Sequence, residues 1–148
     1  MHLLSGMGNR TMLMEAIFMS ASFRDLRVWQ ESMDLVIAVY EHTQSFPRNE
    51  IYGLTGQMRR AALSIPSNIA EGKGRSTGRD RSLFFCHARG SLLELETQIM
   101  IAERLSYLSR EKFQTLTQAA SKIGRMLNAL IDSIRRPEKN DRLGRLCN

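Results

Sequence analysis

The spacing of apolar residues in the last third of the chain constrains the fold most. Between residues 113 and 134, apolar side chains recur at alternating intervals of three and four. This is the period of an α-helix with one face in a hydrophobic core, whereas a half-buried strand alternates at every second residue. The pattern predicts a helix that begins after Ser109, a typical N-cap, and ends before Pro137. Its core-facing residues are Phe113, Leu116, Ala120, Ile123, Leu127, Leu130 and Ile134.

The same period predicts three earlier helices, at about residues 23–45, 50–71 and 79–105. Pro66 falls inside the second of these helices. Since proline lacks an N–H and its ring crowds the carbonyl four residues earlier, we expect a kink there. Gly72 is predicted to follow the end of the second helix as its C′ residue. The expected core residues of the three helices are, in order, Leu26, Trp29, Met33, Val36 and Tyr40; Leu54, Met58, Ala61, Ile65 and Ile69; and Phe85, Ala88, Leu92, Leu95, Ile99 and Ala102.

These helices predict an all-α protein, an antiparallel up-down-up-down four-helix bundle whose second helix is kinked at Pro66. The length of 148 residues suits one domain, which we place at residues 23–136. Residues 1–22 are interpreted as a flexible N-terminal tail and residues 137–148 as a flexible basic C-terminal tail. The sequence contains no run of about 18 uncharged apolar residues, so we predict no membrane span. Two cysteines make no disulfide framework, so a cytoplasmic location is expected.

Two of the predicted helices carry a second apolar row outside the expected core stripe. Burying a side chain of the size of Leu or Val stabilises by about 1.5–3 kcal/mol, and contiguous exposed apolar patches usually mark interfaces. We therefore expect a homo-oligomer in which these rows meet; the alternative is that both rows are internal to one subunit. The predicted interface residues are Val28, Leu35 and Val39 on the first helix, and Cys86, Gly90, Leu93, Thr97, Met100 and Ile101 on the third.

Polar residues gather on one stripe of the second helix around Pro66. They are Arg60, Ser64, Ser67, Asn68 and Glu71. A satisfied polar network that fixes helix packing is the favoured interpretation, because short polar side chains can bond the carbonyls that a proline frees. The other interpretation is a small-molecule site near Asn68, in a closed pocket lined by Ser64, Asn68 and Glu71.

Basic residues dominate residues 59–89, where seven arginines and lysines stand against two acidic residues, Glu71 and Asp80, and we expect them to lie around one end of the bundle. Such an excess favours contacts with the phosphates of nucleic acid, largely indifferent to sequence because no aromatic residues are interleaved for base stacking. The alternative is a solvated surface whose arginines pair with carboxylates or helix ends. The predicted nucleic-acid-binding residues are Arg59, Lys73, Arg75, Arg79, Arg81 and Arg89.

Catalytic motifs are weak throughout the sequence. Neither His42 nor His87 follows a glutamate at the spacing that a di-iron bundle requires. Cys86 and His87 are adjacent, so on a helix they face different sides and cannot act as a nucleophile–base pair. We therefore expect a protein that is not an enzyme, with no catalytic residues, no cofactor and no metal.

Three segments of the chain resemble a known family. They read FRDLRVWQESMDL, YGLTGQMRRAALSIPSNIAEGKGR and ARGSLLELETQI, and the resemblance extends over about residues 23–136. The family comprises bacterial four-helix bundle proteins first noticed as reading frames within intervening sequences of large-subunit ribosomal RNA genes. The resemblance implies an up-down bundle that assembles into a ring, with homopentamers known, and no established enzymatic activity. It also implies similarity to accessory proteins of diversity-generating retroelements, which work with a reverse transcriptase and bind nucleic acid.

The residues and the resemblance together predict a homo-oligomeric, pentameric bundle that acts as an accessory nucleic-acid-binding protein through phosphate contacts. Its expected partners are other copies of itself, RNA or DNA, and a reverse transcriptase or another protein. The alternative is an oligomeric scaffold for protein interactions that binds no nucleic acid and whose arginines form structural salt bridges.

Overall fold

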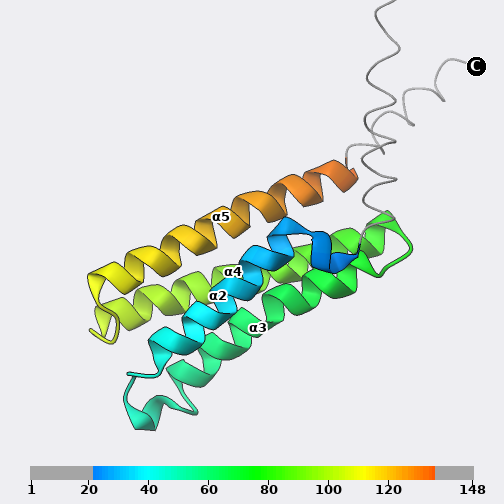
Figure 1. Cartoon of the computed structure of the whole chain (residues 1–148). Coiled ribbons are helices and arrows are strands. Elements are labelled where there is room, and N and C mark those ends of the chain that lie inside the picture. Colours follow the sequence, from blue (N-terminus) through cyan, green and yellow to red (C-terminus); the bar gives the residue numbers. More distant parts are fainter. Residues whose placement is uncertain (1–21, 136–148) are drawn as a thin grey trace, which may run out of the picture.

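The computed structural model describes residues 22–135, which form four long helices and no strand (Figure 1). The helices are α2 (Arg27–Thr43), α3 (Leu54–Lys73), α4 (Gly78–Arg104) and α5 (Arg110–Arg135). Two short 3-10 turns, η1 (Phe23–Asp25) and η2 (Arg48–Glu50), precede α2 and α3. The all-α prediction is confirmed for this part of the chain. The two predicted tails lie outside the described residues, except for Ser22, whose side chain caps η1.

Each long helix packs against two others, so the four surround a common core. α3 contacts α2 and α4, and α5 contacts α2 and α4. In Figure 1 the three connections between successive helices lie at alternating ends of the molecule. Ser109 precedes α5, and its hydroxyl accepts a hydrogen bond from the Lys112 N–H at 3.3 Å, as an N-cap does.

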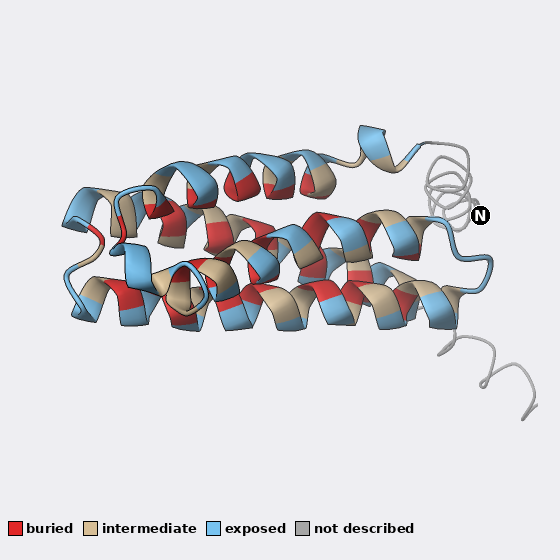
Figure 2. Cartoon of the chain, turned by 90° about the horizontal axis from the view of Figure 1, so that it is seen from below, coloured by how far each residue is buried: buried red, intermediate tan, exposed pale blue. Residues whose placement is uncertain are grey.

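The core is built mainly from the predicted stripes of α3, α4 and α5. Figure 2 shows buried residues on the inward sides of the helices and exposed residues outside. Leu54, Phe113, Leu130 and Ile134 are only half-buried, and Ile131 is buried at the end of α5. The fully buried residues of the predicted stripes are Met58, Ala61, Ile65, Ile69, Phe85, Ala88, Leu92, Leu95, Ile99, Ala102, Leu116, Ala120, Ile123 and Leu127.

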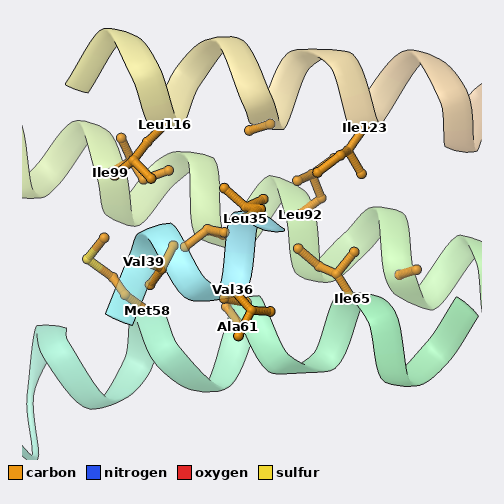
Figure 3. Packing of buried hydrophobic residues seen from close by; sticks show 14 of the residues in the cluster. Leu35, Val36, Val39, Met58, Ala61, Ile65, Leu92, Ile99, Leu116 and Ile123 are labelled. Atoms are coloured by element: carbon orange, nitrogen blue, oxygen red, sulfur yellow. The ribbon is translucent and has the colours of Figure 1, made fainter. Parts of the chain in front are cut away.

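The orientation predicted for α2 is wrong in part, because Val36 is buried and Leu26 and Trp29 pack against the core as expected. However, Val28, Leu35 and Val39, expected at an oligomer interface, are buried within the subunit, whereas Met33 and Tyr40, expected in the core, are exposed. Figure 3 shows Leu35 and Val39 in the core. The α2 row also includes Ser32, which is buried because its hydroxyl donates to the Trp29 carbonyl at 2.8 Å. The second apolar row of α2 therefore belongs to the core and offers no surface to another subunit.

Gly72 does not act as the C′ residue of α3, which is a second correction. It lies inside the helix and is buried, and the helix ends at Lys73 with Gly74 as its C-cap at a φ of −77°. A Cβ atom on Gly72 would lie 2.9 Å from Cε1 of Phe85. Close approach of α3 to α4 therefore explains this glycine. α3 runs through Pro66 without interruption, and the expected kink stays a prediction.

Candidate nucleic-acid interface

The turn between α3 and α4 carries the densest positive charge of the predicted interface. α4 begins where the Thr77 hydroxyl accepts a hydrogen bond from the Asp80 N–H at 3.1 Å and donates to the Asp80 carboxylate at 2.7 Å. This cap fixes a short connection between two long helices. We use the name basic turn for the four cationic residues at this connection, which are Lys73, Arg75, Arg79 and Arg81.

The cations of the basic turn differ in how they are held. Arg75 pairs with Glu71 one helical turn earlier, and its guanidinium lies over the Phe84 ring at 4.4 Å from the centroid. Arg79 is exposed, whereas Lys73 and Arg81 are half-buried. Burial, followed by the positive charge of Arg81, lowers the pKa of the Lys73 ammonium. The basic turn thus presents both an anchored and an exposed guanidinium.

A fifth cation joins the basic turn from the end of α5. Arg135 and Arg79 line the same hollow, which has a volume of about 590 Å³. An Nη atom of Arg135 lies 3.6 Å from Sγ of Cys86, so the guanidinium is placed against α4. Sequence reasoning missed Arg135 because no local pattern links it to a turn more than fifty residues earlier. Only the packing of α5 against α4 brings them together.

Two of the predicted nucleic-acid-binding arginines lie away from the basic turn, contrary to the expectation of a single cluster. Arg59 lies near the start of α3, about 21 Å from Lys73 at a helical rise of about 1.5 Å per residue. Its Nε donates to the Thr43 hydroxyl at 3.0 Å. Arg89 lies near the middle of α4 and donates to the Asn128 side chain on α5 at 3.2 Å. Both arginines therefore link neighbouring helices.

Part of the predicted polar cluster around Pro66 forms a link between α3 and α4. Asn68 donates to the carbonyl of Ser64 at 2.8 Å and to its hydroxyl at 3.0 Å. The Ser91 hydroxyl of α4 donates to the Ser64 hydroxyl at 2.9 Å. Ser91 was not predicted, since nothing in the sequence indicates which residue of α4 lies opposite Ser64. This arrangement is a satisfied network between two helices.

The remaining members of the predicted cluster lie outside this network. The Ser67 hydroxyl donates to the Leu63 carbonyl at 2.8 Å, Glu71 pairs with Arg75, and Arg60 is exposed. The hollow beside Arg79 and Arg135 is not lined by any residue of the predicted polar cluster.

The second apolar row of α4 is exposed except for the half-buried Cys86, unlike that of α2. We call it the α4 outer face; it comprises Cys86, Gly90, Leu93, Thr97, Met100 and Ile101. Leu93 is 57% exposed, Met100 51% and Ile101 43%. A Cβ atom on Gly90 would meet no atom within 4 Å in the subunit. The α4 outer face is therefore an apolar surface without a partner in the described part of the chain.

Among residues 22–135, no three His, Cys, Asp or Glu side chains are grouped so that they could hold a metal ion. No helix in this range combines the length and the apolar character that crossing a bilayer requires.

Comparisons with known proteins identify relatives of the chain. The family model of the 23S rRNA-intervening sequence protein matches residues 24–129. No curated protein matches the chain. A crystal structure from Bacteroides thetaiotaomicron, described as a protein with unknown function from the S23 ribosomal protein family, superposes with a TM-score of 0.66 at 19% identity. The superposition covers 71% of this chain and 95% of the other, so the likeness is one of fold.

Proposed function

We propose that this chain, which belongs to the 23S rRNA-intervening sequence protein family, is a self-associating helical bundle that binds nucleic-acid phosphates. The basic turn carries the proposal, because four cations and Arg135 lie at one end of the subunit against the two carboxylates of Glu71 and Asp80. The ribosomal RNA setting in the family's name is consistent with a nucleic-acid partner. We propose no catalytic step for this protein, and we propose that it is located in the cytoplasm.

The proposed bundle runs up-down-up-down, with a bend of the second helix at Pro66. Short connections between successive helices favour the antiparallel arrangement. The bend is favoured by chemistry, because Pro66 cannot donate a hydrogen bond to the Ala62 carbonyl and its ring crowds that carbonyl.

Self-association would occur through the α4 outer face. Burying Leu93, Met100 and Ile101 against another copy removes a contiguous apolar surface from water, and Gly90 leaves room for a second backbone. A closed ring of five copies would repeat the basic turn and concentrate its positive field. The predicted interface residues of α2, Val28, Leu35 and Val39, have no part in this interface because they are buried within the subunit.

Binding would depend on charge more than on base identity. Arginine and lysine neutralise phosphates and release counterions, so affinity falls steeply with salt. The Arg75 guanidinium lies over the Phe84 ring beside the basic turn, and it occupies that face of the ring in place of a base. We therefore expect similar affinity for RNA and DNA sequences of equal length and structure.

A filter-binding titration with a structured RNA and a duplex DNA, each at low and moderate salt, tests this function. The exposed Arg79 is changed to Gln, and Arg125→Gln on the exposed side of α5 serves as the matched control. The expected result is weaker binding by Arg79→Gln and a salt slope reduced by about one, with the control unchanged. Absence of binding at low salt by folded, assembled protein would overturn the proposal.

Sedimentation equilibrium at micromolar concentration tests self-association separately. Leu93→Gln on the α4 outer face is expected to shift the protein toward single-chain mass. Ile37→Gln, at a similarly exposed apolar residue of α2, is expected to leave the mass unchanged. A folded wild-type protein of single-chain mass would show that the α4 outer face does not mediate assembly.

A protein-interaction scaffold is the second candidate function. It is favoured by the intrachain contacts of Arg59, Arg75 and Arg89, which occupy three of the predicted phosphate ligands. Under this function the α4 outer face still associates, nucleic acid does not bind, and a protein such as a reverse transcriptase is the partner. The titration above distinguishes the two, and co-purification with the neighbouring gene products tests the partner.

A further inference from the structure

A second hollow lies at the connection between α2 and α3, at the end of α3 opposite the basic turn. It has a volume of about 310 Å³, at the small end of the range for ligand sites. We call it the connection hollow. The residues of its lining that matter below are Thr43, Phe46, Arg48, Ile51, Thr55 and Arg59.

The Arg59 guanidinium is held in place at the connection hollow. Its Nε donates to the Thr43 hydroxyl at 3.0 Å, and its central carbon lies 4.7 Å from the centroid of the Tyr40 ring. Thr43 is itself fixed, because its hydroxyl donates to the Val39 carbonyl at 2.8 Å. The two Nη groups of Arg59 remain as donors for a ligand. A guanidinium fixed before binding loses less conformational freedom on binding.

The two arginines at the connection hollow, Arg48 and Arg59, have no acidic partner within ion-pair distance among residues 22–135. The nearby carboxylate of Glu50 does not line the hollow and accepts from the Leu54 N–H at 2.9 Å and the Tyr107 hydroxyl at 3.3 Å. The hollow therefore has two cationic groups and no anionic group in its lining.

Thr55 supplies an independent indication of a missing ligand. The residue is only 3% exposed, and its Oγ1 is buried with no hydrogen-bond partner among the described residues. A buried hydroxyl without a partner costs about 1–3 kcal/mol, so such groups are rare without a reason. Thr55 also lines the connection hollow, and a turn of its side chain toward the hollow would let the hydroxyl donate to an acceptor oxygen of a ligand there.

We propose that the connection hollow binds the oxyanion group of a small organic anion, either a carboxylate or a phosphate monoester. Arg48 and Arg59 would bind the anion, and the Thr55 hydroxyl would donate to one of its oxygens. The apolar part of the ligand would lie against Phe46 and Ile51, which line the same hollow. The site is distinct from the proposed nucleic-acid interface, which lies at the other end of α3.

Titration of the full-length protein with phenyl phosphate, benzoate and inorganic phosphate tests the site. Binding is followed by calorimetry and by the NMR signal of the Arg59 Nε–H group. We expect phenyl phosphate, benzoate or both to bind and to shift that signal. If only one of the two binds, it identifies the anion as a phosphate or a carboxylate; weaker binding of inorganic phosphate supports the apolar contact. Failure of all three to bind at millimolar concentration would overturn the proposal.

Variants separate the site from general folding effects. Thr55→Val keeps the shape of the side chain and removes the unpartnered hydroxyl. It is expected to raise the midpoint of thermal unfolding while weakening the binding of the anion. Arg48→Gln is expected to weaken binding about tenfold, and Arg104→Gln, an exposed arginine near the same end of the bundle, leaves it unchanged. Binding that is equally strong in Thr55→Val and Arg48→Gln would contradict the assignment, whatever the nucleic-acid titration shows.

Discussion

Glycine-to-alanine substitutions give a direct test of how closely α3 approaches α4. We compare three helical glycines, Gly72, Gly90 and Gly124, each of which would gain helix propensity on change to Ala, by up to about 1 kcal/mol. Their surroundings differ. A Cβ on Gly90 would meet nothing within 4 Å, and on Gly124 it would make an ordinary contact at 3.5 Å with Leu92. These two substitutions are expected to raise the free energy of unfolding by about 0.5–1 kcal/mol.

Gly72→Ala is expected to have the opposite sign. The new Cβ would lie 2.9 Å from Cε1 and 3.1 Å from Cδ1 of Phe85, and 3.0 Å from Cβ of Phe84. The Phe85 ring is fully buried and cannot move into solvent. Overpacking of this kind costs about 1–3 kcal/mol, which exceeds the gain in helix propensity. The net expectation is a loss of about 1–2 kcal/mol.

Urea unfolding followed by circular dichroism measures all three variants at one protein concentration. A repeat at tenfold higher concentration separates subunit stability from assembly, because an associating protein gains stability with concentration. Gly124→Ala is the control for propensity alone, since Gly90 lies on the proposed interface. If Gly72→Ala were as stable as Gly124→Ala, the close contact between α3 and the Phe85 ring would be refuted.

Three further predictions concern titration and buried polar groups. The hydrogen bond that Lys122 donates to Glu31 at 2.6 Å lowers the pKa of Glu31. The stability that the Glu31 carboxylate contributes is therefore present above the ordinary pKa of 4.5 and is lost as the pH falls through the lowered pKa. Lys122→Met should reduce the drop in the urea midpoint between pH 7 and acid pH. Burial, and then the carboxylate of Glu50, raise the pKa of Tyr107. Its contribution is thus present below the ordinary value of 10.0 and is lost as the pH rises through the raised pKa, a loss that Tyr107→Phe should abolish in alkaline unfolding curves. Gln98 is buried with an Oε1 that has no partner among the described residues, and Gln98→Met should raise the free energy of unfolding by about 1 kcal/mol in urea; a lower value would indicate that the amide is satisfied.

The apolar period predicted the cores of α3 and α5 because each of these helices has one dominant apolar stripe. It also predicted the core of α4, whose second apolar row is interrupted by Gly90 and Thr97. α2 has two candidate stripes that are offset by about one residue, and the period alone does not choose between them. The large Trp29 and Tyr40 favoured the wrong stripe, although Trp29 is half-buried and Tyr40 exposed. The correct stripe includes the polar Ser32, whose burial depends on its bond to a backbone carbonyl, and a hydrophobicity pattern does not register such a bond.

The candidate sites were less predictable, because they are made by contacts between distant segments. The sequence indicated the basic turn, where the cations are close together along the chain. It did not indicate Arg135 beside Arg79, or Ser91 opposite Ser64, because those pairs depend on how helices pack. Arg59 was assigned to the wrong end of the bundle for a related reason. Residues that are close in sequence can lie far apart in space when a long helix separates them.

Polar bonds that cross between helices have a consequence for the alignment of the bundle. A stripe of similar apolar side chains repeats every turn or two, so two helices could shift along each other and still bury apolar side chains against apolar side chains. Each of the four neighbouring helix pairs is linked by at least one polar contact, which can form only when the two helices are aligned as they are in this structure. The contacts are Arg59 with Thr43, Ser91 with Ser64, Arg89 with Asn128, and Lys122 with Glu31. Shifting any helix by a turn would break its ties to both neighbours, so a few weak bonds at the rim select one arrangement from several that the core alone would tolerate.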